Sequence, residues 1–113
     1  MTIAHATPAA AIILAAGKGT RMKSDLPKVL HPVAGRPMIG HVLHMAESAG
    51  LSPMTLVISP EQTKLQTYAH NLMPDLGIAY QHEQHGTAHA VLAARESLKG
   101  FEGHLVVLYG DTP

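Results

Sequence analysis

The chain has 113 residues, of which 46% are hydrophobic and 14% are charged, and its eight basic residues balance eight acidic ones. This length suits one small domain, and the zero net charge disfavours a nucleic-acid partner, because such binding depends mainly on neutralising phosphates. The sequence contains no cysteine, which excludes disulfides, thiolate nucleophiles and cysteine-based metal sites and is typical of a reducing cytoplasm.

The first predicted element is a buried strand over residues 10–14, after a tail over residues 1–9 that we expect to be flexible. The strand is continuously apolar, as parallel strands covered on both faces are. No Lys or Arg precedes this apolar run, which is also far shorter than the ~20 residues that cross a membrane. We therefore expect no signal peptide, no membrane span and no membrane partner.

Helices and strands are then expected to alternate. Apolar residues at helical spacing predict a helix over residues 37–49, with Pro37 in its first turn and a glycine just past its end. Residues 55–58 predict a second strand. Residues 59–62 (Ser-Pro-Glu-Gln) resemble a capping box with the proline as the first helical residue, which predicts a helix that ends near residue 72.

The pattern is repeated in the last third of the chain. Residues 78–81 predict a third strand, and the Gly86-Thr87 pair is expected to cap a helix over residues 88–98. The residues of this helix expected to face inward are Val91, Leu92 and Leu98.

Residues 105–109 predict a fourth strand, which is again continuously apolar. Strands that alternate with helices predict an α/β fold of three layers, α/β/α, in which helices cover both faces of a mostly parallel sheet. No helix follows the fourth strand to cover it. We therefore expect residues 10–113 to form the first half of a larger, truncated domain, and the fourth strand to expose an unpaired edge.

A glycine-rich, basic segment follows the first strand. Gly17 and Gly19 let the backbone turn sharply and approach a ligand closely, and successive N–H groups in such a turn form a concavity that binds anions. Half of the eight basic residues lie within this segment: Lys18, Arg21, Lys23 and Lys28. The segment predicts a polyphosphate site, and the alternative is a tight turn among solvated lysines.

Two common phosphate loops do not fit this segment. The Walker A pattern G-x-x-x-x-G-K-[ST] and the dinucleotide pattern G-x-G-x-x-G, when they are counted from Gly17, both require a glycine at position 22. The residue there is Met22. The sequence therefore disfavours a P-loop ATPase and an NAD enzyme.

The same residues resemble the signature of the sugar-1-phosphate nucleotidyltransferases. The resemblance rests on Leu-Ala-Ala-Gly-x-Gly-Thr-Arg-Met at residues 14–22 and on segments at 26–31, 81–90 and 108–113, in family order and spacing. It extends to the uridylyltransferase part of the bacterial bifunctional enzymes that make UDP-N-acetylglucosamine. It implies a Rossmann-like nucleotidyltransferase fold.

The activity implied by the resemblance is transfer of a uridylyl group from UTP to N-acetylglucosamine 1-phosphate, with release of pyrophosphate, for peptidoglycan and lipopolysaccharide synthesis. Such reactions depend on positioning and charge stabilisation rather than on a covalent intermediate. The resemblance also implies a cytoplasmic protein whose full-length parent is a homotrimer with an acetyltransferase half. We expect the 113-residue chain alone to be inactive or nearly so. A sister enzyme for another nucleotide and an inactive nucleotide-binding fragment remain as alternatives.

The resemblance assigns the phosphate chemistry to three residues. Arg21 is implied to clamp the departing β- and γ-phosphates, and Lys28 to meet the α-phosphate or the sugar phosphate. Asp111 is implied to bind Mg²⁺, for which a carboxylate is a suitable hard ligand. Lys18 and Lys23 are left open between phosphate contacts and surface charges.

The other implied contacts hold the nucleotide. Gln81 is placed at the uracil, whose pairing edge an amide donor and acceptor can read; the alternative is a polar residue at the end of a strand. Residues 14–17, Gln81 and Asp111 also fall at the carboxyl ends of predicted parallel strands, where open α/β sheets bind ligands. The full set of implied substrate contacts is Leu14, Ala15, Ala16, Gly17, Lys28, Gln81, Gly86, Thr87, Tyr109 and Gly110.

Nine histidines raise the alternative of a metal site. His85 and His89 are four residues apart, and His41 and His44 are three apart, but neither pair belongs to an H-E-x-x-H arrangement. We therefore expect these histidines to be surface or helix-packing residues rather than zinc ligands.

Overall fold

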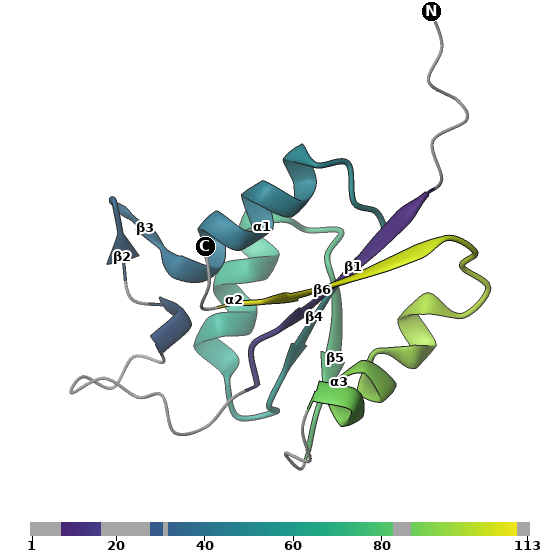
Figure 1. Cartoon of the computed structure of the whole chain (residues 1–113). Coiled ribbons are helices and arrows are strands. Elements are labelled where there is room, and N and C mark those ends of the chain that lie inside the picture. The colour runs from purple at the N-terminus through teal and green to yellow at the C-terminus, as the bar shows by residue number, and fades with distance from the viewer. Residues whose placement is uncertain (1–7, 17–27, 31, 83–86, 111–113) are drawn as a thin grey trace, which may run out of the picture.

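The computed structural model describes residues 8–16, 28–30, 32–82 and 87–110, without the side chains at positions 28, 87, 88, 96 and 97 (Figure 1). None of the helices in these ranges is long and apolar enough to cross a membrane. In chain order the elements, with η for a 3₁₀ helix, are β1 Ala9–Leu14, η1 Lys28–Leu30, β2 Pro32–Val33, β3 Arg36–Pro37, α1 Met38–Ser48, β4 Met54–Ile58, α2 Thr63–Leu72, β5 Gly77–Tyr80, α3 Thr87–Ala93, η2 Arg95–Leu98 and β6 His104–Tyr109.

The four predicted strands, β1, β4, β5 and β6, form one parallel sheet in the order β5-β4-β1-β6. β1 pairs with β4 on one side and β6 on the other, so that Ile12 lies between Thr55 and Val107. From Ala10 to Ile13 the strand is fully buried, because both of its edges are paired and both faces are covered. The prediction of a buried parallel first strand is confirmed.

Helices cover both faces of the sheet, with α1 and α2 side by side on one face and α3 on the other (Figure 1). Alternate residues of a strand serve opposite faces. Ile13 belongs to the core that contains Ile39 of α1 and Leu65 of α2, whereas its neighbour Ile12 belongs to the core that contains Ala90 of α3. The predicted three-layer α/β/α arrangement is therefore confirmed.

α1 begins and ends close to its predicted limits. Pro37 immediately precedes the first turn, with a φ of −52°, rather than belonging to it. At the other end, the N–H groups of Gly50 and Leu51 donate to the carbonyls of Glu47 and Ala46, at 3.0 and 3.1 Å. Gly50 has a φ of +79°, a left-handed conformation that glycine adopts readily and that ends the helix.

A short antiparallel hairpin of β2 and β3 precedes α1 and is absent from the sequence predictions. Its turn residues, Ala34 and Gly35, have φ values of 51° and 80°. Positive φ at both central positions matches the twist of a two-residue hairpin. Strands of two residues carry no periodic pattern, which is why the sequence shows no signal for them.

α2 ends at Leu72 as predicted, but it begins at Thr63 instead of Pro60. Residues 59–62 form a turn ahead of the helix. The Ser59 hydroxyl, which a capping box would place on the helix backbone, donates instead to the carbonyl of Ala16, at 3.1 Å. The predicted helix start was wrong because a tertiary acceptor takes the capping group.

α3 is shorter than predicted, since it ends at Ala93 and the chain continues as η2. Leu92, which was expected to face inward, is 61% exposed, whereas Ala90 and Ala94 are buried against the sheet. Positions four apart share one side of a helical turn, so Leu92, midway between these alanines, points away. Val91 and Leu98 pack against this core as predicted.

β6 forms one end of the sheet and pairs only with β1 among the described residues. Leu105 on this strand is 43% exposed. The expected unpaired edge is present in the described part of the chain.

Candidate functional site

The carboxyl ends of the parallel strands lie along one edge of the sheet, and backbone hydrogen bonds continue past the strand ends there. Three such bonds join neighbouring strands: Ala15 N–H to Val57 O at 2.9 Å, Gln81 N–H to Ile58 O at 2.8 Å and Gly110 N–H to Leu14 O at 2.9 Å. Segments far apart in sequence are thereby held side by side at the edge where open α/β sheets bind ligands. We call this edge the carboxyl edge.

Gly110 lies very close to the backbone that leaves β1. A Cβ atom at this position would lie 3.0 Å from Cδ1 of Ile39 and 3.3 Å from both Cβ of Ala15 and the carbonyl oxygen of Leu14. Such distances are shorter than ordinary van der Waals contact. A side chain at position 110 would therefore push the carboxyl edge apart.

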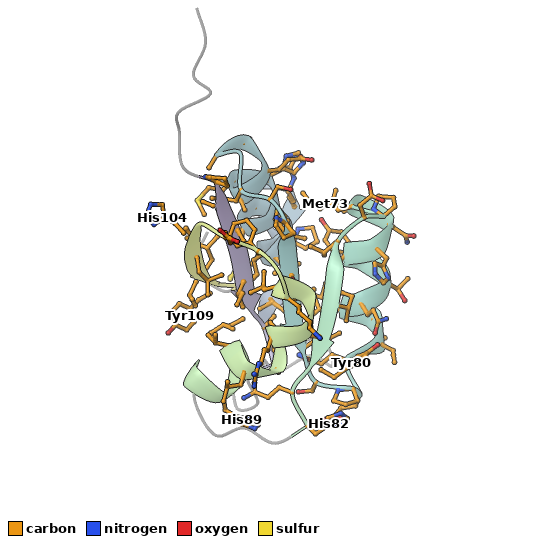
Figure 2. The ribbon with its side chains drawn as sticks, turned by 90° about the vertical axis from the view of Figure 1, so that its right-hand side faces the viewer. Met73, Tyr80, His82, His89, His104 and Tyr109 are labelled. Atoms are coloured by element: carbon orange, nitrogen blue, oxygen red, sulfur yellow. The ribbon has the colours of Figure 1, made fainter. Side chains whose placement is uncertain are left out.

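Gln81 is only 6% exposed, although it follows the last residue of β5. Its side-chain Nε2 lies 3.1 Å from Nδ1 of His89, which belongs to α3 and is half-buried. Gln81 is therefore held by the protein rather than being a loose polar residue at a strand end. His82 and His89 lie at the same end of the molecule, opposite Met73 (Figure 2).

Two side chains ahead of α2 bind the backbone that follows β1. Ser59 donates its hydroxyl to the carbonyl of Ala16 at 3.1 Å, and Gln62 donates its amide Nε2 to the carbonyl of Ala15 at 3.0 Å. The Gln62 Oε1 accepts the N–H of Ser59 at 2.6 Å. The start of the predicted phosphate segment is therefore tied to the loop after β4.

Tyr109 is the last residue of β6 and lies opposite Leu14 in the register with β1. It is 49% exposed. The structure places it near Gly110 at the carboxyl edge, as expected, and its contact with the sugar side of a nucleotide stays a prediction.

Several predicted site residues fall outside the described residues: Gly17, Lys18, Arg21, Lys23, Gly86 and Asp111. Lys28 opens η1 and Thr87 opens α3, and for these two only the backbone is described. η1 is anchored to the domain because Val29 and Leu30 belong to the core that contains Ile39. The roles assigned to all these residues stay predictions.

The residues that the structure describes include no group of three or more His, Asp or Glu side chains suited to a metal ion. Asp111 is the predicted Mg²⁺ ligand, and it lies outside them. The magnesium prediction therefore depends on the sequence alone.

Sequence reasoning missed three residues of this edge. Ser59 and Gln62 were noted only as a helix cap, and His89 only as a metal candidate. The position of Ser59 in the sequence could have identified it. Ser59 is the first residue after β4, just as Gln81 is the first residue after β5. Polar residues at that position of a parallel strand face the carboxyl edge.

A family model for the MobA-like NTP transferase domain matches residues 11–113. Curated relatives include the bifunctional protein GlmU of Hyphomonas neptunium, which is 53% identical over 104 residues, covering 92% of this chain and 23% of that protein. The GlmU of Rhodospirillum rubrum is 51% identical over 107 residues, covering 95% and 23%. The chain thus spans about a quarter of the length of these relatives.

Solved structures share the fold. The HddC protein from Yersinia pseudotuberculosis, complexed with GMP-PN, has a TM-score of 0.73 at 24% identity and matches 89% of this chain and 47% of its own. A UDP-glucose pyrophosphorylase from Acinetobacter baumanii has a TM-score of 0.75 at 23% identity, with coverages of 92% and 46%. An inositol-1-phosphate CTP transferase from T. maritima reaches 0.75 at 20% identity, with coverages of 94% and 44%.

Proposed function

The chain belongs to the MobA-like NTP transferase domain family, and we propose that it carries the UTP-binding edge of a uridylyltransferase that makes UDP-N-acetylglucosamine. The substrate pair, UTP and N-acetylglucosamine 1-phosphate, is supported by identities of 53% and 51% to bifunctional GlmU proteins. Those relatives are much longer than this chain, and the proposal concerns the part of the reaction that residues 8–110 could serve.

One observation carries the proposal: along the carboxyl edge Gly110 is hydrogen-bonded to Leu14, while Ala15 and Gln81 are hydrogen-bonded to adjacent residues at the end of β4. The phosphate-binding signature begins in the segment that contains Ala15. Gln81 carries the amide proposed to read the base, and Gly110 directly precedes the proposed metal ligand. Their meeting at one edge supports a single site for base and phosphates, because ligands of open α/β sheets bind there.

In the proposed reaction an oxygen of the sugar 1-phosphate attacks the α-phosphorus of UTP and pyrophosphate leaves. Gln81 orients the uracil through its amide, and Gly110 lets the backbone after β6 lie close to Leu14 and Ala15 at the same edge. Arg21 and Lys28 stabilise the charge that develops on the phosphates. Positioning and electrostatics of this kind are sufficient for phosphoryl and nucleotidyl transfer.

Magnesium belongs to the same proposal. Asp111 would bind the ion, which would neutralise phosphate charge when it is present. Further parts of the proposal are a cytoplasmic location, a homotrimeric parent with an acetyltransferase half, and a role in cell-wall and lipopolysaccharide precursor synthesis. We also place residues 10–113 in the first part of the nucleotidyltransferase domain, which agrees with coverages of 44% to 47% of the solved neighbours.

A hybrid protein tests the activity. This chain would replace the aligned 104-residue segment of the Hyphomonas neptunium GlmU, and pyrophosphate release would be measured with N-acetylglucosamine 1-phosphate and each of UTP, CTP, GTP and dTTP. We expect the highest kcat/KM with UTP. Equal or better use of CTP or GTP would instead favour a sister nucleotidyltransferase.

A second test uses the 113-residue chain alone. It should bind UTP measurably by calorimetric titration and show little or no turnover, because the residues that recognise the acetyl sugar are expected outside it. Robust synthesis of UDP-N-acetylglucosamine by this chain would refute that expectation.

A further inference from the structure

We infer that Ser59 and Gln62 are positioning residues that hold the two peptide units after β1 in place and thereby increase the affinity for the nucleotide. The link to nucleotide affinity rests on the proposed function, whereas the ordering of the backbone is a property of the chain itself. We call this pair of side chains the Ser59–Gln62 clamp.

The clamp acts where regular sheet structure stops. β1 ends at Leu14, and the N–H of Ala15 still donates to Val57 in the manner of the sheet. The carbonyls of Ala15 and Ala16 are bound by side chains instead, by Gln62 at 3.0 Å and by Ser59 at 3.1 Å. The clamp therefore hydrogen-bonds the backbone at the point where sheet hydrogen bonding ends and the glycine-rich segment begins.

The Gln62 amide has only one orientation that satisfies both of its partners. A backbone N–H can only donate and a backbone carbonyl can only accept. Because Oε1 faces the N–H of Ser59 at 2.6 Å and Nε2 faces the carbonyl of Ala15, exchanging the two amide atoms would break both hydrogen bonds. The amide thus ties the position of Ser59 to that of Ala15.

Burial strengthens the clamp. Ser59, Ala15 and Ala16 are exposed by only 5%, 6% and 5%, so water has little access to the hydrogen bond between Ser59 and Ala16, whereas the two hydrogen bonds of the half-buried Gln62 are partly buried. In such surroundings a hydrogen bond is electrostatically stronger and its loss is more costly. The link also joins residues 43 and 47 positions apart, so it constrains tertiary structure rather than a local turn.

The geometry of the peptide bond connects the clamp to ligand binding. In a trans peptide unit the C=O and the following N–H lie in one plane and point in opposite directions. Holding the carbonyl of Ala15 in place therefore sets the direction of the Ala16 N–H, and holding the carbonyl of Ala16 fixes the other end of the same residue. If the Ala16 amide helps to bind the nucleotide phosphates, the clamp reduces the ordering cost of binding.

The experiment uses the 113-residue chain and magnesium UTP. Ser59→Ala removes the hydroxyl, and Gln62→Met removes the amide while keeping a long, uncharged side chain. Gln66→Met is the matched control, since Gln66 lies one turn further along α2 and accepts a hydrogen bond from the hydroxyl of Tyr80 at 2.8 Å, outside the clamp. Ser59→Thr keeps the hydroxyl and serves as the conservative variant.

We expect Ser59→Ala and Gln62→Met each to raise the Kd for UTP about tenfold, the equivalent of one lost hydrogen bond. Gln66→Met and Ser59→Thr should stay within about twofold of the parent. All titrations are made well below the lowest melting temperature among the variants, so that a change in Kd reports positioning rather than unfolding. Unchanged Kd values in both clamp variants, with a parent that binds UTP, would overturn the inference.

Amide hydrogen exchange gives a readout that does not depend on the nucleotide. In the clamp variants, exchange at the N–H of Ala16, the amide that follows the clamped carbonyl of Ala15, should be at least several-fold faster than in the parent, and unchanged in Gln66→Met. If the parent fails to bind UTP, the proposed function fails, and the affinity part of the inference fails with it. Unchanged exchange rates would then also overturn the ordering part.

Discussion

The side-chain nitrogen Nε2 of Gln81 lies 3.1 Å from Nδ1 of His89, on the helix that follows. An imidazole nitrogen without a proton accepts a hydrogen bond from the amide, whereas a protonated one donates and would turn the amide around. The orientation of the amide that is proposed to read uracil thus depends on a neighbouring histidine. Because uracil and cytosine present opposite donor and acceptor groups at N3 and at the substituent on C4, this contact bears on the choice of nucleotide.

Replacing His89 by phenylalanine should lower the preference for UTP over CTP about tenfold, since the Gln81 amide would lose the partner that orients it. The measurement is the ratio of kcat/KM for the two nucleotides in the hybrid protein. His82→Phe is the control, because His82 is exposed at the same end of the molecule (Figure 2). An equal fall in kcat/KM for both nucleotides would show that His89 supports the fold and not the selection of the base.

Gly110→Ala should destabilise the chain by about 1–3 kcal/mol, the usual cost of overpacking. The new Cβ would lie 3.0 Å from Cδ1 of Ile39. Ile39→Val removes that atom, so the double variant should be more stable than the sum of the two single changes, by about 1 kcal/mol. Urea unfolding of the four proteins measures this coupling. Simple additivity would mean that Ala15 and the Leu14 carbonyl, rather than Ile39, limit the space.

Thr55→Val should stabilise the chain by about 1 kcal/mol. Thr55 is the second residue of β4 and is 1% exposed, and its hydroxyl has no hydrogen-bond partner among the described residues. Valine keeps the shape and removes the polar atom, whereas Thr55→Ser keeps the hydroxyl, loses a methyl group and should be destabilising. Thermal unfolding distinguishes the two. Loss of stability in Thr55→Val would show that the hydroxyl is satisfied in solution.

Among the described residues β6 has one unpaired edge, which should make the chain self-associate because an open apolar strand is a template for pairing with another copy. Leu105→Lys places a charge on this strand and should increase the monomer fraction in sedimentation velocity at a given concentration. Leu92→Lys is the matched control, since Leu92 is also exposed but lies on α3. Equal effects of the two changes would point to apolar surface in general rather than to strand pairing.

The layer architecture was predictable because its signals are local. Residues 10–14 are all apolar and gave β1 to within one residue, and the apolar spacing before Gly50 gave α1 to within one residue at each end. The two-residue strands of the hairpin carry no such pattern and were missed. Hydrophobicity alone did not predict which residues of this helical segment face the sheet, since two small alanines are buried there and the larger Leu92 is exposed.

The candidate site was predictable as a set of segments but not as a set of contacts. Gln81 was placed at the carboxyl edge because it ends a predicted strand, and the structure puts it there. The hydrogen-bond partner of Gln81 was not predicted, because the sequence between β5 and α3 does not indicate how α3 packs against β5.

The sequence by itself determined which stretches are strands and helices and in which order the proposed nucleotide-binding segments occur, since these follow from apolar periodicity, glycine and proline. Only the tertiary structure decided what the polar groups beside those segments bind. Ser59 and Gln62 match a capping box, and Gln62 makes its half of that motif by accepting the Ser59 N–H. The Ser59 hydroxyl binds the carbonyl of Ala16 instead, because parallel pairing of β1 with β4 brings that acceptor, 43 residues away, within 3.1 Å.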